Sequence, residues 1–438
     1  MTAVTGQQGL DQGDQARGAG RRDWDERRAR RTHALGGSEI TAILSLAGAT
    51  DVITFSGGFP EPATFQTGTL AGIAARLIAE EPGVALQYSA TEGLAGIREY
   101  VSGRLAAQEG LAPGAGELMI TSGGIDCMEL LAKSYVDPGD VVVVEAPTYL
   151  GGLMAFRGYE ADVRGVPLDD AGMRVDVLAG LLAGGLRPKI VYTIPDYQNP
   201  TGLSMSAERR QALVDLARRY DFLILEDVAY RELGFGHPEN GHPENGHPEG
   251  GPLKNAAAPM PSMWSLAPDV VLQAGTFSKI FSPGFRMGWA AGPAEVIGRL
   301  VIAKQNSDQC AGSLGQRMLE EYGRGGHMDR QIAASRVLYE RRARLTTDAL
   351  AAHMPDGAAW TTPAGGFYVW LTCAEGVDTV ALSAAARAEK VAYVPGRPFY
   401  LEDAGVGANQ IRLAYSRVAD DLIDEGIRRI ADVVKSAL

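Results

Sequence analysis

The sequence contains little cysteine: Cys127, Cys310 and Cys373 are the only three among 438 residues. Their number is odd, they lie far apart and no Cys-x-x-Cys pair occurs, so we expect no disulfide framework and no zinc site. We expect no other metal site either. Disulfides are rare in reducing compartments, so three free thiols are typical of a cytoplasmic protein.

Long apolar runs and a basic charge balance are also absent. No stretch of about 18 uninterrupted apolar residues occurs, so we expect no membrane span. No apolar segment follows the charges near the N-terminus, so we expect no signal peptide. Lys and Arg number 41 against 53 Asp and Glu, and the resulting net charge of −12 argues against a general nucleic-acid binder.

Several common catalytic motifs are missing too. The sequence has no GxxxxGK[ST], no complete GxGxxG, no HExxH and no GxSxG. Nucleotide-loop, zinc-protease and serine-hydrolase sites therefore lack their main residues.

The sequence does have enough apolar residues, 45% of the chain, to build a large core. Its 55 Gly residues follow no collagen period, so we expect them at turns and at close backbone approaches. Residues 1–30 have little to bury and predict a disordered arm. The arginines in this arm could contact nucleic acid, but acidic residues interrupt them and a solvated helix start is the favoured interpretation.

From about residue 65, helical patterns alternate with continuous apolar runs that end in polar residues. The four runs are Val141–Val144, Ile190–Ile194, Phe222–Leu225 and Val270–Gln273. Such runs fit a parallel sheet that is covered on both faces. Ligands bind beyond the carboxyl ends of such strands, so the polar residues that follow the runs are the candidates for chemistry.

Residues 236–250 repeat the pattern Gly-His-Pro-Glu and contain three of the six His residues. A metal-binding tract is one interpretation. We favour an expanded surface loop, because no regular element spaces the histidines.

The pattern changes after residue 310. A helical pattern runs over 316–352, and apolar strands are predicted at 365–371 and 411–415. We predict a large domain over 65–312 and a small α+β domain over 313–438, joined by the N-terminal segment 31–64.

Lys279 lies just after the fourth apolar run, in Gly275-Thr276-Phe277-Ser278-Lys279. A buried lysine loses its charge more readily and becomes a nucleophile. Considered alone, a lysine that extends to solvent from a helix start is the favoured alternative.

Arg286 follows seven residues later among apolar residues and glycine, where a bidentate contact to a buried anion is favoured over a surface ion pair. Thr276 and Ser278 could bind the same anion. Asp227 lies at the end of the third run, and Tyr230 follows three residues later. Asp227 is either a buried carboxylate that faces a cation or the N-cap of the next helix.

Two turns complete the set. Asn199 precedes Pro-Thr-Gly and can both donate and accept through its amide, although turn formation alone would also explain it. We expect Thr201 or Ser206 to start the next helix. Gly123 and Gly124 precede a helix near Ile125 and would let backbone amides approach a phosphate.

Taken in order, these residues resemble one family. The set comprises Gly123-Gly124, Pro147-Thr148-Tyr149, Asn199-Pro200-Thr201-Gly202, Asp227-Val228-Ala229-Tyr230, Ser278-Lys279, Arg286 and Arg412. It is similar to the fold-type I pyridoxal-phosphate enzymes, and more narrowly to the 2-aminoadipate aminotransferase-like branch of the class I/II aminotransferases. The resemblance covers about residues 33–438.

The resemblance implies an α/β fold whose large domain has a mixed, mostly parallel, seven-stranded sheet between helices, with a small α+β domain formed by both chain ends. It implies pyridoxal 5′-phosphate as cofactor and a homodimer. The implied reaction moves an amino group from an L-amino acid to a 2-oxo acid such as 2-oxoglutarate, in two half reactions.

The resemblance also implies the role of each site residue. Lys279 would bind the cofactor covalently and move the substrate proton. The cofactor-binding residues would be these: Asp227 at the ring nitrogen, Asn199 and Tyr230 at the ring hydroxyl, Tyr149 on the ring face, Gly123, Gly124, Thr276, Ser278 and Arg286 at the phosphate, and Tyr88 at the phosphate of the partner subunit. The substrate-binding residues would be Arg412, Asn199, Gly58 and Ser38.

Two departures from the family pattern bear on function. Many relatives carry Ser and Gln where Gly124 and Ile125 stand, so the phosphate must depend on backbone amides. Residues 38–43 contain no Arg that would bind an acidic substrate, which leaves room for aromatic or aliphatic side chains.

Two other hypotheses remain at this stage. The same residues would serve a pyridoxal-phosphate decarboxylase, lyase or oxidase. A transcription factor that carries this fold is the other, but we expect the arm to be too short for a DNA-binding domain.

Overall fold

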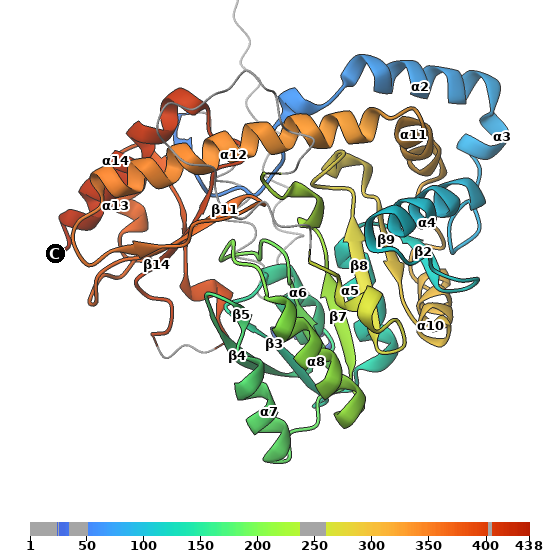
Figure 1. The fold of residues 1–438 in the computed structure, drawn as a ribbon, viewed down its shortest axis with the longest axis horizontal. Coiled ribbons are helices and arrows are strands. Elements are labelled where there is room, and N and C mark those ends of the chain that lie inside the picture. The colour runs from blue at the N-terminus through green and yellow to red at the C-terminus, as the bar shows by residue number, and fades with distance from the viewer. Residues whose placement is uncertain (1–23, 25, 35–50, 237–259, 402–404) are drawn as a thin grey trace, which may run out of the picture.

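The four apolar runs form the adjacent central strands of one sheet in the computed structural model (Figure 1). The structure describes all residues except 1–23, 25, 35–50, 237–259 and 402–404. The central strands are β3 (Val141–Ala146), β6 (Ile190–Thr193), β7 (Leu223–Asp227) and β8 (Val271–Thr276). They lie parallel in the order β8-β7-β6-β3, so their carboxyl ends meet at one edge. Their side chains are almost all buried, as continuous apolar runs predict.

The outer strands extend this sheet to eight strands, in the order β2-β9-β8-β7-β6-β3-β4-β5. They are β2 (Leu118–Thr121), β4 (Asp162–Asp169), β5 (Gly172–Met173) and β9 (Gly288–Ala291). The expected number of strands in this sheet, seven, was one too low. The additional strand is the two-residue β5, which returns antiparallel along β4 because Gly172 adopts a left-handed φ of +91° at a tight turn.

Helices from the same part of the chain cover the sheet. They are α4 (Ala95–Glu109), α5 (Gly124–Tyr135), α6 (Leu150–Arg157), α7 (Val175–Ala183), α8 (Ala207–Tyr220), α9 (Met263–Leu266) and α10 (Ala294–Gln305). Helix α5 packs on α6 and α10, whereas α8 packs on α7 and α9, and the sheet lies between these two groups. Of the two predicted starts of α8, Ser206 is the N-cap: its side chain accepts a hydrogen bond from the Arg209 amide.

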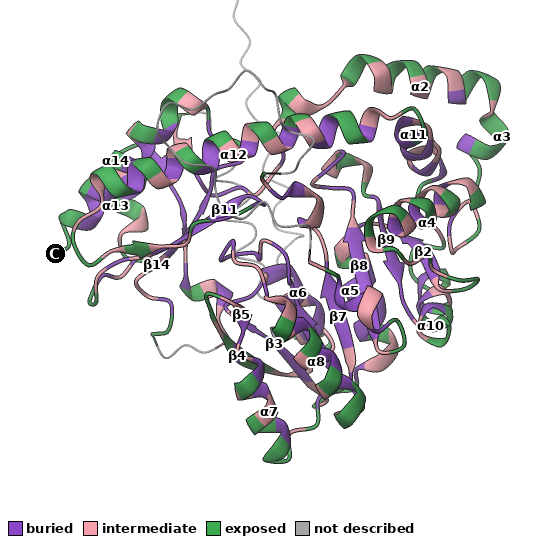
Figure 2. Ribbon diagram, viewed as in Figure 1, coloured by how far each residue is buried: buried purple, intermediate pink, exposed green. Residues whose placement is uncertain are grey.

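A second sheet comes from the C-terminal part of the chain, in the order β10-β11-β14-β13. Its strands are β10 (Ala359–Trp360), β11 (Tyr368–Thr372), β13 (Val394–Pro395) and β14 (Gln410–Ala414), all paired antiparallel. Helices α12 (His327–His353), α13 (Ser383–Ala388) and α14 (Asp420–Lys435) accompany it. Figure 2 shows the buried sides of α12 and α14 turned toward this sheet and their exposed sides outward.

The helical pattern predicted over 316–352 forms two helices rather than one. Helix α11 (Ser313–Arg324) ends at a Gly-Gly pair, and α12 begins after Gly326, whose φ is +69°. A left-handed glycine ends a helix at low cost, which explains the break. Helix α11 packs on α2 (Thr67–Glu80), α3 (Pro82–Ala85) and α4, and α12 continues to the second sheet.

The N-terminal segment joins the C-terminal part through a short parallel pair. Strand β1 (Ile53–Thr54) pairs with β12 (Val391–Ala392), and both contact α14. Phe55 follows β1 and is fully buried. Most of the predicted disordered arm lies outside the described residues, as does nearly all of the repeat at 236–250. Trp24 and residues 26–30 are described, and Arg30, which begins the 3-10 helix η1 (Arg30–Ala34), forms an ion pair with Glu160. The domain boundaries stay predictions.

The three cysteines are free thiols, as expected. Cys127 and Cys373 are buried and Cys310 is partly buried, and none is in a disulfide. Among the described residues, no helix is long and apolar enough to cross a membrane.

We expect Gly426→Ala to destabilise the protein by about 1–3 kcal/mol, the range for overpacking a core. A Cβ at Gly426 in α14 would lie 2.6 Å from Phe55 Cε2 and 2.8 Å from Ile53 Cγ2. The matched control is Gly298→Ala in α10, where a Cβ meets nothing within 4 Å. That control should stabilise the protein by about 0.5–1 kcal/mol through helix propensity. Thermal unfolding measures both, and equal effects would contradict the packing of β1 on α14.

Candidate active site

The carboxyl ends of the central strands bring the predicted polar residues together. Asp227 ends β7, and Lys279 lies three residues beyond the end of β8. Asn199 follows β6, and Tyr149 follows β3 at the start of α6. Arg412 comes from β14 of the second sheet and reaches the same place, because its Nη1 donates to Asn199 Oδ1 at 3.1 Å. The site therefore lies between the two sheets.

The Lys279 amine faces the protein interior. Its Nζ donates to Gly58 O at 2.8 Å and lies within 6 Å of the ring centres of Tyr230 and Phe367. Burial and the positive charge of Arg412 lower the pKa of Lys279 to about 8, although Asp227 acts in the opposite direction. The alternative of a lysine extending to solvent is wrong. An amine with this pKa is neutral in a substantial fraction of molecules near neutral pH, as a nucleophile requires.

Asp227 is a buried carboxylate held by hydrogen bonds. Its Oδ2 accepts from Tyr192 Oη at 3.0 Å and its Oδ1 accepts from the Ala229 amide at 3.1 Å. Burial raises the pKa of Asp227 to about 6, against the opposing effect of these hydrogen bonds. Within the described part of the chain, no Lys or Arg forms an ion pair with it. The N-cap alternative is wrong, because the next helical turn has Tyr230 as its N-cap.

Arg412 is a buried guanidinium with unused hydrogen-bonding capacity. Besides the bond to Asn199, its Nη2 donates to Ser56 O at 2.7 Å, and its Nε has no partner among the residues that the structure describes. The guanidinium carbon lies 4.7 Å from the ring centre of Tyr368 and 5.0 Å from that of Phe399. No carboxylate among the described residues pairs with Arg412. A buried arginine in this state fits an anionic ligand.

The turn before α5 lies against the guanidinium of Arg286. Gly123 has a φ of +102°, and a Cβ there would lie 2.7 Å from Arg286 Nη2. Arg286 Nη2 also donates to Ser122 O at 3.3 Å. Thr276 Oγ1 donates to Ser278 Oγ at 3.0 Å on the facing segment. The left-handed φ favours glycine at 123, and without a Cβ there the turn can present its backbone amides to a ligand.

Glu145 holds the loop that carries Asn199. The buried carboxylate accepts hydrogen bonds from Thr193 Oγ1, the Ile194 amide and Gln198 Nε2. Burial raises the pKa of Glu145 to about 7. The turn prediction for this loop is confirmed, and its internal bonds include the Thr201 amide and hydroxyl donating to Gln198 Oε1.

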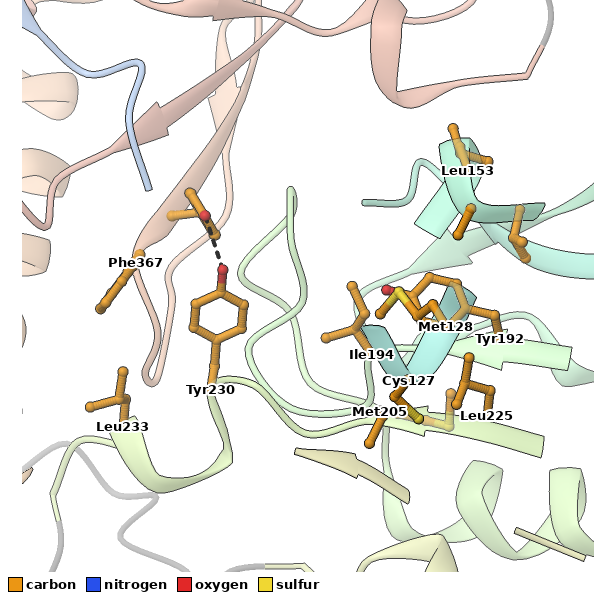
Figure 3. Close-up of a cluster of buried hydrophobic side chains, with 14 of the residues drawn as sticks. Cys127, Met128, Leu153, Tyr192, Ile194, Met205, Leu225, Tyr230, Leu233 and Phe367 are labelled. Carbon is orange, nitrogen blue, oxygen red and sulfur yellow. Dashed lines mark hydrogen bonds between the residues drawn. The ribbon is translucent and has the colours of Figure 1, made fainter. Parts of the chain in front are cut away.

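Sequence reasoning missed two tyrosines of the site. Tyr192 supports Asp227 from β6, and Tyr368 Oη lies 3.0 Å from Tyr230 Oη (Figure 3, dashed line). The alternation of side chains along β11 could have predicted that Tyr368 lies near Arg412. It shares a sheet face with Trp370, which is the register partner of Arg412 on β14.

The structure brings most but not all of the predicted site residues together. Gly58 lies against Tyr368 so closely that a Cβ would clash with the hydroxyl. Tyr88 lies on the surface, 78% exposed, between α3 and α4. Ser38 lies outside the described residues. Among the residues that the structure describes, no three His, Cys, Asp or Glu are grouped to bind a metal ion.

Comparison with known proteins identifies the family of this chain. The sequence model of the family described as aminotransferase class I and II matches residues 50–430. The chain belongs to the class I and II aminotransferases. The family prediction is thus confirmed.

Relatives place this aminotransferase more narrowly. Aromatic-amino-acid aminotransferase 1 of Thermococcus litoralis is 37% identical over 421 residues, covering 95% of this chain and 96% of the relative. The 2-aminoadipate transaminase of Thermus thermophilus is 33% identical over 419 residues, covering 95% and 98%. The predicted 2-aminoadipate aminotransferase-like branch is confirmed.

A solved structure gives the cofactor. The alpha-aminoadipate aminotransferase of Thermus thermophilus, complexed with N-(5′-phosphopyridoxyl)-L-leucine, has a TM-score of 0.83 and 32% identity and covers 95% of this chain and 99% of its own. The fold class and pyridoxal 5′-phosphate as cofactor are confirmed. This aminotransferase transfers amino groups between amino acids and 2-oxo acids, and no finding favours another reaction of the cofactor.

The buried charge of Asp227 predicts a stability cost in the cofactor-free protein. Its pKa is raised in the folded state, so the folded protein binds more protons between about pH 4 and 6 and loses stability as pH rises through that window. We expect cofactor-free Asp227→Asn to be more stable than the parent at pH 8, on the order of 2–3 kcal/mol. The difference should disappear near pH 4.

Calorimetric unfolding of the cofactor-free proteins across this pH range measures the effect. Asp348→Asn, an exposed change on α12, is the control and should follow the parent. An Asp227→Asn protein that is less stable than the parent at pH 8 would contradict the burial argument.

Proposed function

We propose that the residues gathered between the two sheets hold pyridoxal 5′-phosphate and the substrate amino acid, and that Lys279 moves the reacting proton. The observation that carries the proposal is the pair of buried, uncompensated charges on Asp227 and Arg412. Each needs a ligand of opposite charge. When bound, the cofactor supplies an aldehyde that reacts with amines and a ring that accepts electron density.

The phosphate would lie at the turn before α5. The amides of Gly123 and Gly124 open the helix, and Arg286 reaches across the turn. Ser278 and Thr276 face it as hydroxyl donors. A phosphate bound at these groups would meet a guanidinium and free backbone N–H groups, the combination that anions prefer at helix N-termini.

The ring would lie over the carboxyl ends of β7 and β8. Asp227 would bond the ring nitrogen and favour its protonated form, a charge-assisted contact in a buried place. Asn199 and Tyr230 would bond the ring hydroxyl, and Tyr149 would stack on the ring face. The hydrogen bond between Tyr230 and Tyr368 would keep the Tyr230 hydroxyl oriented.

Lys279 Nζ would bind the cofactor in the resting enzyme. During the reaction its amine would carry the proton from the substrate α-carbon to C4′ of the cofactor, and in the second half reaction it would carry a proton back from C4′ to the α-carbon of the new amino acid. The amine is suited to both because the surrounding protein lowers its pKa to about 8. This two-step use of one amine fits a ping-pong mechanism.

The substrate α-carboxylate would bind Arg412, whose Nε has no partner among the described residues and could form a planar pair of hydrogen bonds together with the second N–H of an Nη atom. Asn199 and Gly58 would complete this end of the site, with Ser38 from the segment outside the described residues.

We propose aromatic or aliphatic amino acids as preferred donors, with a 2-oxo acid such as 2-oxoglutarate as acceptor. The side chains around Arg412 are aromatic, namely Tyr368, Phe399 and Trp370, and residues 38–43 offer no Arg for an acidic side chain. The aromatic-amino-acid aminotransferase among the relatives supports this preference.

The proposed enzyme is a homodimer. Tyr88 is a large, exposed aromatic residue, and its proposed place is against the cofactor phosphate of the partner subunit. A cytoplasmic location, indicated by the cysteine content, belongs to the same proposal.

We expect L-phenylalanine and L-leucine to be faster donors than L-2-aminoadipate when 2-oxoglutarate is the acceptor, with one glutamate formed for each 2-oxo acid released. Lys279→Ala should lose at least about three orders of magnitude in rate, because the group that transfers the proton is gone. Lys390→Ala, an exposed lysine paired with Asp51, is the control and should keep full activity.

Coupled assays and chromatography of both products measure these rates. Carbon dioxide or ammonia released without an equivalent of glutamate would contradict transamination. Rates highest with L-2-aminoadipate would contradict the proposed donor class.

A further inference from the structure

A fully buried lysine lies behind the turn before α5. Lys304, in the last turn of α10, has no exposed surface. Its Nζ lies 2.8 Å from Asp126 Oδ2, 2.8 Å from Asp308 Oδ2 and 3.1 Å from Ser122 Oγ. An ammonium buried this deeply is tolerated only when its charge and its hydrogen bonds are satisfied. Lys304, Asp126, Asp308 and Ser122, here called the Lys304 cluster, satisfy both the charge and the hydrogen bonds of the ammonium.

The Lys304 cluster holds Ser122 by its polar atoms. The Ser122 amide donates to Asp126 Oδ2 at 2.7 Å, and its hydroxyl donates to Asp308 Oδ2 at 2.6 Å. Its carbonyl accepts from Arg286 Nη2 at 3.3 Å. Ser122 is followed directly by Gly123, so its orientation sets the direction of the amides that face the ligand.

The charges of the cluster matter for an anion at this turn. Asp126 lies in the first turn of α5, where an uncompensated carboxylate would repel a phosphate. Lys304 neutralises the charge of Asp126, and the same oxygen, Oδ2, also accepts the hydrogen bond from the Ser122 amide. The turn gains a fixed geometry without presenting a net negative charge from Asp126 to the ligand.

Backbone geometry is important here because side-chain donors are few. Gly124 and Ile125 carry no polar side chain, so the phosphate depends on amides, on Arg286 and on two hydroxyls across the site. An amide that points wrongly has no side chain beside it to replace its hydrogen bond.

We propose that Lys304 is a positioning residue for the cofactor phosphate: through Asp126, Asp308 and Ser122 it fixes the amides of the Gly123-Gly124 turn. The inference rests on the proposed function, in which this turn and Arg286 bind the phosphate. Lys304 touches no reacting atom, and its effect falls on phosphate recognition.

The test compares two ligands that differ only in the phosphate. Cofactor-free protein is titrated with pyridoxal 5′-phosphate and with pyridoxal, and the visible absorbance of the lysine-bound aldehyde is followed. We expect Lys304→Met to weaken the affinity for pyridoxal 5′-phosphate by about tenfold or more, the effect of losing a charge-assisted contact. The affinity for pyridoxal should change by less than about twofold, which is within ordinary context effects.

Three further variants make the result specific. Lys133→Met removes a lysine from the same α5–α10 contact, where Nζ bonds only carbonyls of Ala303 and Asn306, and should leave both affinities unchanged. Adding Asp126→Asn to Lys304→Met should restore part of the lost affinity, because the amide oxygen still accepts from Ser122 and the first turn of α5 then carries no unpaired carboxylate. The Asp308 charge that remains is partly exposed to solvent. Asp308→Asn, at a partly exposed carboxylate, should show a smaller selective loss and replaces Lys304→Met if that protein does not fold.

Arg286→Gln separates failure of this inference from failure of the proposed function. If Arg286→Gln shows no selective loss for the phosphorylated ligand, the proposed phosphate site is wrong. If it does, and Lys304→Met and Asp308→Asn do not, the role of Lys304 is wrong. Equal losses for both ligands would also overturn the inference, because they would indicate a purely structural role.

Discussion

Two opposite charges, on Asp227 and Arg412, are buried in the site between the two sheets, and neither has a partner of opposite sign in the described part of the chain. Asp227 accepts only neutral hydrogen bonds, and Arg412 donates only to an amide oxygen and a carbonyl. Burial of unpaired charge is costly, so the rest of the fold must hold these groups in place until ligands compensate them. Lys279 belongs to the same site, where burial and the charge of Arg412 lower its pKa and Asp227 acts in the opposite direction.

The two-sheet architecture explains how such an arrangement persists. Parallel strands place Asp227 and Lys279 on a rigid edge, and a separate antiparallel sheet delivers Arg412 to the opposite side. The segment around Ser56 connects the two, since it follows β1 on the second part and accepts from Arg412. A substrate that binds Arg412 and a cofactor that binds Asp227 would therefore compensate charges on both sheets at once. The Lys304 cluster holds Ser122, before the Gly123-Gly124 turn, by hydrogen bonds, just as Tyr192 and the Ala229 amide hold Asp227.

Much of this was predictable from local sequence. Continuous apolar runs identified the central strands, and the polar residues after them, Asp227, Lys279 and Asn199, do lie together. Local patterns failed where a distant partner decides the outcome. Arg412 and Asn199 are 213 positions apart, and the Lys304 cluster joins residues near 124 and 306. Strand β5 and the break before α12 depend on single left-handed glycines that pattern counting does not weigh. The place proposed for Tyr88 depends on a second chain, and Ser38 lies outside the described residues.

The central claim is that Asp227 is buried without a cation because the cofactor ring nitrogen supplies one. The most direct test uses a cofactor analogue in which a C–H group replaces that nitrogen. Cofactor-free parent protein should bind the analogue at least about tenfold more weakly than pyridoxal 5′-phosphate, the effect of one lost charge-assisted hydrogen bond. Asp227→Asn should bind the two with nearly equal affinity. Equal affinities in the parent protein would contradict the account.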